Sequence, residues 1–477
     1  MRKLRSSAPL ILLLSLIMIA TLSSTITIAR ASQACSKEFK CGVLEVPLDY
    51  TKQDSEKIKI SYAIRALDSS KPKLFINPGG PGGSGLNYLF NYKKYFTKEL
   101  YSNFTLVALD TRGSGSSDPI RCLSDAQEDT LNNFNPFNTS KENYGAFNLS
   151  SAILSQKCKE KYGSKLEAYN LDNIVRDYHS LMLKLGEKKF NFFGKSYGSA
   201  IAIRFSEIYP NQSNFLIADG VVNPNLPLSV SIANHQKALI RSYNLFVKYT
   251  SIKSTPLGKA PLEVTKSINQ ILWKLSKPVS IDNSKYKFDQ SALIAAIIAS
   301  LYQGQRGYDT LIKELIDAKA GEYSALHAKA QGLIGRDKKG KYMDMVDYSY
   351  IITCQSTLKD RDFLINNIKI TPNVSPLTDY LAVYIRATYI PCAHFANQPI
   401  INKSSPSKIL LLSNLYDPIT PNEDALLVKE QNKKAILLTN AGTTHTVYAL
   451  SGPCADNEVF NYLSTGQVTK TSCSVKQ

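Results

Sequence analysis

The sequence predicts an α/β fold in which a mostly parallel central sheet is flanked by helices. Short apolar runs typical of buried strands recur along the chain, at residues 73–77, 104–109, 190–193, 215–218, 409–412 and 435–438. Apolar residues at helical spacing fill residues 170–185, between two of these runs. Strands that alternate with helices form parallel sheets. Residues 42–50 and 58–67 predict two further strands that pair with each other.

A mainly helical insertion is predicted between late strands of this sheet. Strands are sparse from residue 225 to residue 405, and helical periods occur at residues 292–301 and 310–318, ahead of which residues 304–307 predict a turn. A chain of 477 residues is long enough for one large domain with such an insertion. We therefore divide the chain into a signal peptide (1–31), a first part of the core (32–224), a helical cap (225–405) and a second part of the core (406–477).

The first 31 residues predict export. Three basic residues within the first five precede a long apolar run, and the sequence ARA at 29–31 fits the small-x-small rule for signal cleavage. An uncleaved anchor is the alternative, because moderately apolar residues continue to Ile28. We expect a secreted or periplasmic protein that has no stable membrane span once the signal is removed.

Cysteine usage agrees with export. Eight cysteines follow the predicted signal: Cys35, Cys41, Cys122, Cys158, Cys354, Cys392, Cys454 and Cys473. An even number in an exported chain favours disulfides, and pairing each cysteine with its neighbour in sequence is the simplest hypothesis. Lipidation of Cys35 is a weaker alternative, since residues 32–34 lack a leucine-led box and one cysteine would lose its partner. None of the spacings is that of a zinc site.

The charge of the chain is strongly basic without being clustered. The 57 Lys and Arg residues and 39 Asp and Glu residues give a formal net charge of +18. The basic residues lie singly or in short pairs, without the interleaved aromatic residues of proteins that bind single-stranded nucleic acids. We expect a solvated basic surface and no nucleic-acid partner.

The strongest local motif is FGKSYGS, at residues 193–199, which contains G-x-S-x-G. It follows an apolar run and precedes a helical one, as a nucleophile elbow requires, so Ser196 is the predicted nucleophile. A Cβ atom at Gly194 or Gly198 would collide with neighbouring backbone in such a sharp turn.

A serine nucleophile needs a histidine base and a carboxylate that orients the base. Of the five histidines, His445 alone lies just beyond a late buried strand, and His394 is the runner-up. Asp417 follows the strand at 409–412, so the order Ser196, Asp417, His445 is the one that an α/β-hydrolase sheet imposes. Asp219 is the alternative acid, although a turn-capping role before Gly220 suits it better.

A glycine-rich turn, NPGGPGGSG at residues 77–85, follows the strand at 73–77. A phosphate cradle is the alternative reading, but no Lys-Ser/Thr pair follows the glycines. An oxyanion hole needs backbone amides presented without side chains in the way, and we expect the amides of Gly80 and Tyr197 to supply it. This chemistry requires no metal or organic cofactor.

The joint order of several motifs resembles that of a known family. VPLDY (46–50), NPGGPGGSG (77–85), LDTRGSGSSDP (109–119), GKSYGS (194–199), ADGVVNP (218–224) and YDPITP (416–421) resemble the exported tripeptidyl aminopeptidase branch of the proline-iminopeptidase-like α/β-hydrolases. The similarity runs from about Cys41 to Cys473. It implies the same nucleophile, acid, base and oxyanion donors. One departure is Thr443-Thr444 before His445, where relatives usually carry a glycine.

The resemblance implies a secreted serine exopeptidase that hydrolyses peptide bonds near a free N-terminus. A buried ammonium group needs a carboxylate partner, and the cap offers Glu314, Glu322, Asp344 and Asp347, which the sequence does not rank. An exported carboxylesterase or lipase-like enzyme with the same triad is the alternative, and a non-catalytic envelope protein is a second one.

Overall fold

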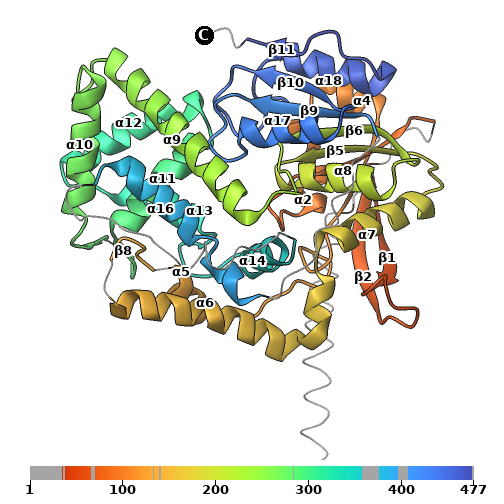
Figure 1. Cartoon of the computed structure of the whole chain (residues 1–477), viewed down its shortest axis with the longest axis horizontal. Coiled ribbons are helices and arrows are strands. Elements are labelled where there is room, and N and C mark those ends of the chain that lie inside the picture. Colours follow the sequence, from red (N-terminus) through yellow and green to blue (C-terminus); the bar gives the residue numbers. More distant parts are fainter. Residues whose placement is uncertain are drawn as a thin grey trace, which may run out of the picture.

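A nine-stranded sheet runs through the part of the chain that the computed structural model describes (Figure 1). The described residues are 35, 38–65, 70–132, 134–138, 141–282, 284–356, 375–395 and 407–474. The strands are β1 (Phe39–Pro47), β2 (Lys57–Arg65), β3 (Lys73–Asn77), β4 (Thr105–Leu109), β5 (Phe190–Lys195), β6 (Ser213–Asp219), β9 (Ile409–Asn414), β10 (Ile436–Asn440) and β11 (Ser472–Cys473). All eight strands that the sequence predicts are present, and β11 is additional.

The sheet has the order β1-β2-β4-β3-β5-β6-β9-β10-β11. Strands β1 and β2 are antiparallel to each other, β2 is antiparallel to β4, and every pair from β4 to β11 is parallel. The central strands are buried over nearly their whole length, because helices cover both faces of the parallel part. The predicted α/β class with a mostly parallel sheet is confirmed.

Two apolar cores lie on opposite faces of the sheet. On one face, α2 (Gly85–Phe90), α3 (Tyr92–Tyr95), α4 (Lys98–Asn103) and α18 (Pro453–Thr465) pack against strand residues such as Phe193 and Leu412. On the other face, α7 (Leu171–Lys184), α8 (Tyr197–Ile208) and α17 (Asn422–Gln431) pack against residues such as Phe192 and Leu411. Alternating side chains of one strand thus serve both cores.

The chain between β6 and β9 is mainly helical and fills most of the left half of Figure 1, above α6. Its described elements are α9 (Leu228–Ile252), α10 (Pro261–Lys274), α11 (Gln290–Leu301), α12 (Gln305–Lys319), α13 (Ser324–Leu333), α14 (Met345–Gln355), α16 (Leu377–Ala387), the 3₁₀ helix η2 (Ile390–His394) and a small hairpin of β7 (Val279–Ser280) and β8 (Lys287–Phe288). The turn predicted at 304–307 is wrong in part: Gly304 is the N-cap of α12, and the next three residues are its first turn. The division of the core and cap at residues 224 and 405 remains an interpretation.

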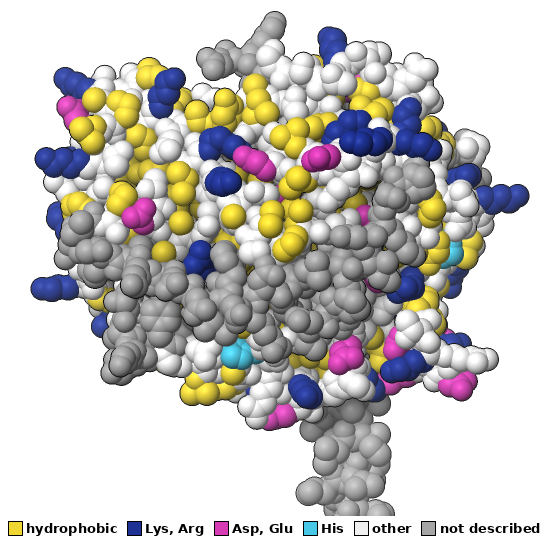
Figure 2. Space-filling model, in the orientation of Figure 1, with side chains coloured by type: hydrophobic (Ala, Val, Ile, Leu, Met, Phe, Trp, Pro, Cys, Tyr) yellow, Lys and Arg dark blue, Asp and Glu magenta, His cyan; other side chains and the backbone are white. Residues whose placement is uncertain are grey.

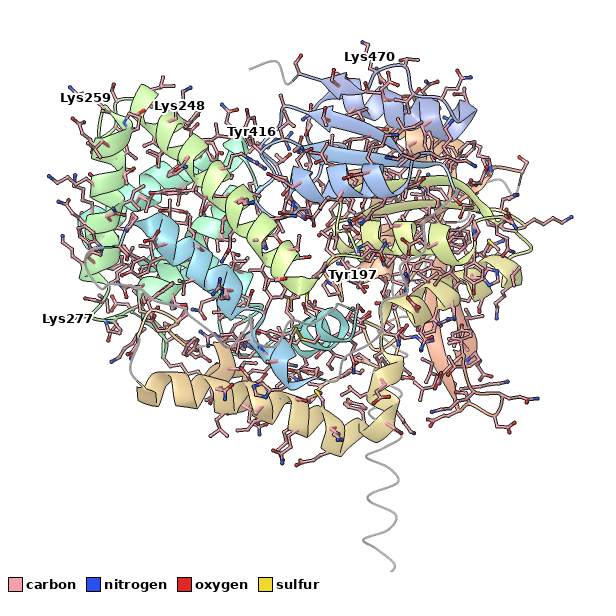
Figure 3. All side chains as sticks on the ribbon, in the orientation of Figure 1. Tyr197, Lys248, Lys259, Lys277, Tyr416 and Lys470 are labelled. Atoms are coloured by element: carbon pink, nitrogen blue, oxygen red, sulfur yellow. A yellow bond between two sulfur atoms is a disulfide. The ribbon has the colours of Figure 1, made fainter. Side chains whose placement is uncertain are left out.

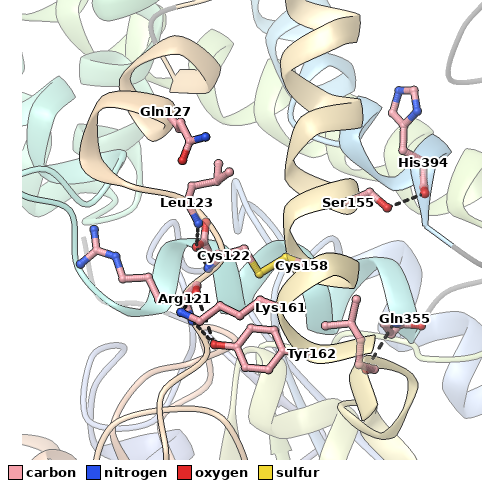
Figure 4. The surroundings of a disulfide bond; sticks show 12 residues. Arg121, Cys122, Leu123, Gln127, Ser155, Cys158, Lys161, Tyr162, Gln355 and His394 are labelled. Atoms are coloured by element: carbon pink, nitrogen blue, oxygen red, sulfur yellow. Dashed lines mark hydrogen bonds between the residues drawn. A yellow bond between two sulfur atoms is a disulfide. The ribbon is translucent and has the colours of Figure 1, made fainter. Parts of the chain in front are cut away.

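Four disulfides join neighbouring cysteines, as the sequence predicts: Cys35–Cys41, Cys122–Cys158, Cys354–Cys392 and Cys454–Cys473. Figure 4 shows the second of them, which ties the segment after β4 to α6 (Lys141–Tyr162). Beside it the Ser155 hydroxyl of α6 donates to the His394 carbonyl at 2.7 Å, so α6 is attached to the insertion although it precedes the elbow in sequence.

The predicted signal peptide lies outside the described residues. Within the described residues, no helix is both long and apolar enough to cross a membrane. On the face that Figure 2 shows, Lys and Arg side chains lie round much of the described surface, and several of them lie close together at the upper right.

Candidate active site

The carboxyl ends of the central strands lie in register at one edge of the sheet. Asn77 of β3 faces Gly194 of β5, Lys195 faces Asp219 of β6, and Asp219 in turn faces Leu412 of β9. The loops that follow these strands carry the predicted site residues. Parallel strands therefore bring together segments that are more than 300 residues apart in sequence.

Ser196 lies in a sharp turn between β5 and α8. Its backbone has φ 53° and ψ −123°, which a residue with a side chain rarely adopts, and its amide donates to the Asp219 carbonyl at 2.8 Å. A Cβ atom on Gly194 would lie 2.0 Å from the Gly198 carbonyl oxygen, and one on Gly198 would lie 2.8 Å from the Asn77 carbonyl oxygen. The predicted need for both glycines is confirmed.

The glycine-rich turn after β3 lies against this elbow. A Cβ atom on Gly79 would lie 2.8 Å from Ser196 Cβ and 2.9 Å from the Tyr197 amide nitrogen. Gly79 has φ 91°, which also favours glycine, and its amide donates to Asn77 Oδ1 at 2.8 Å. Tyr197 is the first residue of α8, where amides lack partners inside the helix. The structure thus brings the turn that contains Gly80 to the amide of Tyr197.

His445 and Asp417 are hydrogen-bonded to each other at the same edge. His445 Nδ1 lies 3.2 Å from Asp417 Oδ1 and 3.1 Å from Oδ2. The Thr420 hydroxyl and the Thr446 amide also donate to Oδ2, at 2.6 Å and 3.1 Å. A carboxylate that accepts from Nδ1 fixes the tautomer in which Nε2 is free to act as a base.

The carboxyl group of Asp417 is fully buried, yet it is held in the charged form. Burial alone would raise its pKa, but the charge of His445 and the hydrogen bonds from His445 and Thr420 outweigh burial and lower the pKa below its usual value. Such an anion can orient His445 and stabilise its protonated form.

Gly220 connects the His445 side chain to the elbow. A Cβ atom on Gly220 would lie 3.6 Å from His445 Cε1, and the Gly220 carbonyl accepts from the Ser199 hydroxyl of α8 at 3.1 Å. Because the Ser196 amide binds the residue before Gly220, the elbow and the imidazole lie on either side of the same short backbone segment. Tyr197 and Tyr416 both lie on the side of the core that faces the helical insertion (Figure 3).

Asp219 has a different role from the turn cap that the sequence indicates. Its carboxylate accepts from the amides of Val447 and Tyr448, at 2.7 Å and 3.1 Å, and lies 3.7 Å from Lys195 Nζ. The structure places it beneath the histidine loop, with both oxygen atoms occupied. Sequence reasoning missed this contact, since it joins residues 228 positions apart.

Three other histidines have partners away from this edge. His394 Nε2 contacts Asn148 Oδ1 of α6, His179 Nε2 contacts Gln212 Oε1, and His327 Nε2 contacts Ser284 Oγ. The runner-up His394 is therefore not brought to Asp417 or Ser196.

His235 of α9 is a neighbour of the triad that sequence reasoning missed. Its Nε2 is buried and has no hydrogen-bond partner among the described residues. Burial lowers its pKa to about 4, and the opposing charges of Asp417 and His445 both act on it. The ring is therefore neutral at neutral pH and adds no positive charge beside the base. The helical spacing of apolar residues in this part of the sequence did not indicate that His235 lies near the triad.

Asp110 and Arg112, both in the motif at residues 109–119, support the turns of the site. Asp110 Oδ1 accepts from the Ser84 hydroxyl at 2.7 Å and its Oδ2 from the Ser116 amide at 2.7 Å, which joins the two glycine-rich turns. The buried Arg112 guanidinium donates to both oxygens of buried Asp177, at 2.8 Å and 2.7 Å. These residues hold the turns that flank the elbow.

A cavity of about 510 Å³ lies apart from the triad, with Asp172, Arg204 and Ser356 among its lining residues. Neither Ser196 nor His445 lines it. The described residues contain no group of three or more His, Cys, Asp or Glu side chains that could hold a metal ion. The chemistry that the arrangement supports is nucleophilic attack by a serine.

Comparison with known proteins gives the same class. A family model described as the alpha/beta hydrolase fold matches residues 72–231, and one described as TAP-like protein matches residues 382–473. The chain is a serine hydrolase with the α/β-hydrolase fold. Its resemblance to the tripeptidyl aminopeptidases, which the motifs indicated, is confirmed by these two matches and by curated relatives.

Three relatives span most of the chain. Serine protease Hip1 of Mycobacterium tuberculosis is 27% identical over 89% of this chain and 85% of that protein. Tripeptidyl aminopeptidase of Streptomyces lividans is 24% identical over 90% of this chain and 82% of that protein. Carboxylesterase B of Mycobacterium tuberculosis is 23% identical over 91% of this chain and 85% of that protein.

Proposed function

We propose that the protein is an exported serine exopeptidase that removes short peptides from a free N-terminus. The observation that carries the proposal is the His445–Asp417 pair, with 3.1 Å between Nδ1 and Oδ2, at the same sheet edge as the strained Ser196 elbow. Two relatives support peptide bonds as the substrate class, since they are named a serine protease and a tripeptidyl aminopeptidase.

The proposed reaction is a two-step acyl transfer. Ser196 Oγ bonds to the carbonyl carbon while its proton passes to His445 Nε2, and the amides of Gly80 and Tyr197 bind the developing oxyanion. His445 Nε2 then donates that proton to the leaving amine as the C–N bond breaks. Water then bonds to the acyl carbon while Nε2 takes its proton, and Nε2 returns that proton to Ser196 Oγ as the ester bond to the serine breaks. Asp417 remains ionised throughout.

The helical insertion would restrict the substrate to a chain end. Of the four carboxylates expected from the sequence, Glu314 already pairs with Lys329 at 2.7 Å, and Asp347 accepts from the Cys122 and Leu123 amides at 2.6 Å and 3.0 Å. Glu322 and Asp344 lie on the surface, and Asp344 is 3.4 Å from Arg121. The proposal requires a group that binds the substrate ammonium, and we assign no residue to that role.

The disulfides and the predicted signal peptide together support the proposal that the protein is exported. Four cystines account for all eight cysteines. Disulfides form and persist in oxidising compartments, which include the bacterial periplasm and the extracellular space.

A carboxylesterase is the second candidate function. The similarity to Carboxylesterase B favours it, and the same nucleophile, base and oxyanion donors hydrolyse esters by the same two steps. The candidates differ in whether they require a free amine and in whether they cleave amide bonds.

Hydrolysis of matched substrates tests the proposal. We would compare a chromogenic tripeptide amide with a free N-terminus, its N-acetylated form and a short-chain ester, with the wild-type enzyme and with Ser196→Ala. Cleavage of the free-amine peptide alone, by the wild type alone, supports the exopeptidase. Ester cleavage without peptide cleavage indicates the esterase instead, and activity that survives in Ser196→Ala contradicts the triad and leaves the non-catalytic alternative open.

A further inference from the structure

The turn that joins α11 to α12 contacts the loop that carries His445. The Tyr302 carbonyl accepts a hydrogen bond of 3.0 Å from the His445 amide. The Gln305 amide donates to the Thr443 hydroxyl at 2.9 Å. Arg306 Nη2 donates to the Leu450 carbonyl at 3.0 Å. One short segment of the insertion thus binds the histidine loop before, at and after the histidine.

The Tyr302 ring also forms one wall around the imidazole. The centroids of the Tyr302 and His445 rings are 4.9 Å apart and the rings are nearly perpendicular, at 80°. Asp417 holds Nδ1, and Gly220 lies beside Cε1. An edge-to-face aromatic contact stabilises one relative orientation of two rings. Tyr302 therefore limits rotation of the imidazole about its Cβ–Cγ bond.

Gly304 allows this contact to be made between backbones. It has φ 57° and ψ −146°, and a Cβ atom there would lie 2.6 Å from both the carbonyl carbon and the hydroxyl of Thr443 and 2.7 Å from the Thr444 amide nitrogen. Because Gly304 is the N-cap of α12, the Gln305 amide lacks a partner within the helix, and the Thr443 hydroxyl satisfies it. Thr443 contributes this acceptor, which glycine in its place would lack.

We propose that residues 302–306, which form the α11–α12 turn and the first residues of α12, position the general base, with Tyr302 and Thr443 as positioning residues that hold His445 toward Ser196. The insertion then has two roles: it restricts the substrate, and it completes the catalytic geometry. The inference rests on the proposed function only in taking His445 as the base. The other ionisable groups that act on His445 are Asp417 after β9, Asp219 of β6 and His235 of α9.

The test compares paired variants of the full chain. Tyr302→Ala removes the ring and Tyr302→Phe keeps it; Thr443→Val removes the hydroxyl at nearly constant shape and Thr443→Ser keeps it. Leu262→Ala, on the exposed surface of α10 in the same insertion, is the control. For each we would measure Tm, kcat, KM and the rate of inactivation by phenylmethylsulfonyl fluoride.

We expect Tyr302→Ala to lower kcat and the inactivation rate by about 10-fold to 100-fold, as misplacement of a catalytic group by 1 Å does, with KM nearly unchanged. Thr443→Val should show a smaller loss of the same kind, while Tyr302→Phe, Thr443→Ser and Leu262→Ala stay close to wild type. The inactivation rate is measured without peptide, so it reports on Ser196 and His445 whatever the true substrate is.

Two results would overturn the inference. Tyr302→Ala and Thr443→Val could lower Tm while kcat and the inactivation rate stay at the wild-type level, or they could change KM alone. If Tyr302→Ala does not fold, Thr443→Val, which is nearly isosteric, still tests the inference by the same measurements. Failure of the triad assignment differs from both, since the wild type would then resist the inhibitor and Ser196→Ala would keep its activity. Failure of the exopeptidase assignment alone differs too, since it changes the substrate that is cleaved and not the inactivation by the inhibitor.

Discussion

The Asp219 carboxylate accepts a hydrogen bond of 2.7 Å from the backbone amide of Val447, two residues beyond His445. The same carboxylate accepts from the next amide, and Asp219 carries the carbonyl that binds the Ser196 amide. One residue at the end of β6 therefore connects the backbone of the proposed nucleophile to the loop of the proposed base. This relationship separates the roles of the two buried acids near His445.

Asp219→Asn should destabilise the fold more than it impairs the chemistry. An amide nitrogen in place of one carboxylate oxygen would face a backbone N–H group that needs an acceptor, and a buried donor left unpaired costs about 1–3 kcal/mol. We expect a lower free energy of unfolding in urea and a modest loss of kcat. If Asp219→Asn lost as much kcat as Asp417→Asn at unchanged stability, Asp219 would be the acid of the triad.

Asp417→Asn should abolish most of the activity. The amide group can still contact Nδ1, but it favours the wrong histidine tautomer and cannot stabilise the imidazolium ion, a change that lowers kcat by about 10⁴-fold in serine hydrolases with a triad. Steady-state kinetics on the best substrate would measure this, with Asp219→Asn as the matched control. A loss of less than about 10-fold would contradict the assignment of Asp417.

The local sequence pattern predicted most strands of the sheet and the candidate site residues. Features that depend on contacts between distant segments were not predicted. Strand β3 (Lys73–Asn77) has the predicted bounds, because it is a short apolar run that ends in glycines. The elbow was predictable because the strand, the turn and the helix that form it are consecutive in sequence. By contrast α6 (Lys141–Tyr162) was missed, since polar residues break its apolar spacing.

Several contacts between distant residues were not predictable from the sequence. Asp219 binds residues 228 and 229 positions later, and His235 approaches the triad from a helix whose sequence shows only an ordinary apolar spacing. The turn at residues 304–307 became the start of α12 because the Thr443 hydroxyl, over 130 residues away, satisfies the amide of Gln305. The partner that stabilises this helix end is supplied by the fold.

Arg112→Met should unfold the protein at much lower denaturant concentration. The substitution leaves the Asp177 carboxylate buried without a counter-charge and removes donors from the Leu48 and Ala168 carbonyls. Breaking a buried pair from one side costs about 3–5 kcal/mol. Urea unfolding followed by fluorescence would measure the loss. Arg241→Met, which breaks a pair with the partly exposed Glu423, is the comparison, and an equal effect of both would contradict the special weight given to Arg112.

Asp424 should make the stability of the protein fall as the pH rises from weakly acidic to neutral. Burial raises its pKa to about 7 from 3.8, against a hydrogen bond from Asn234 Nδ2 at 2.8 Å. The folded state then holds a proton that the unfolded state has lost. The stabilisation is therefore complete below pH 3.8 and disappears as the pH rises through 7, by roughly 4 kcal/mol in all.

Asp424→Asn keeps the neutral form at every pH and should remove this dependence. We expect the variant to have a higher Tm than the wild type at pH 8 and a similar Tm at pH 4.5. Glu423→Gln is the matched control, because the neighbouring Glu423 pairs with Arg241 at 2.7 Å and its pKa is lowered. Its contribution has the opposite sign, since it is present above the unfolded pKa of 4.5 and is lost as the pH falls. Equal Tm values for Asp424→Asn and the wild type at pH 8 would mean that Asp424 is ionised in the fold without cost.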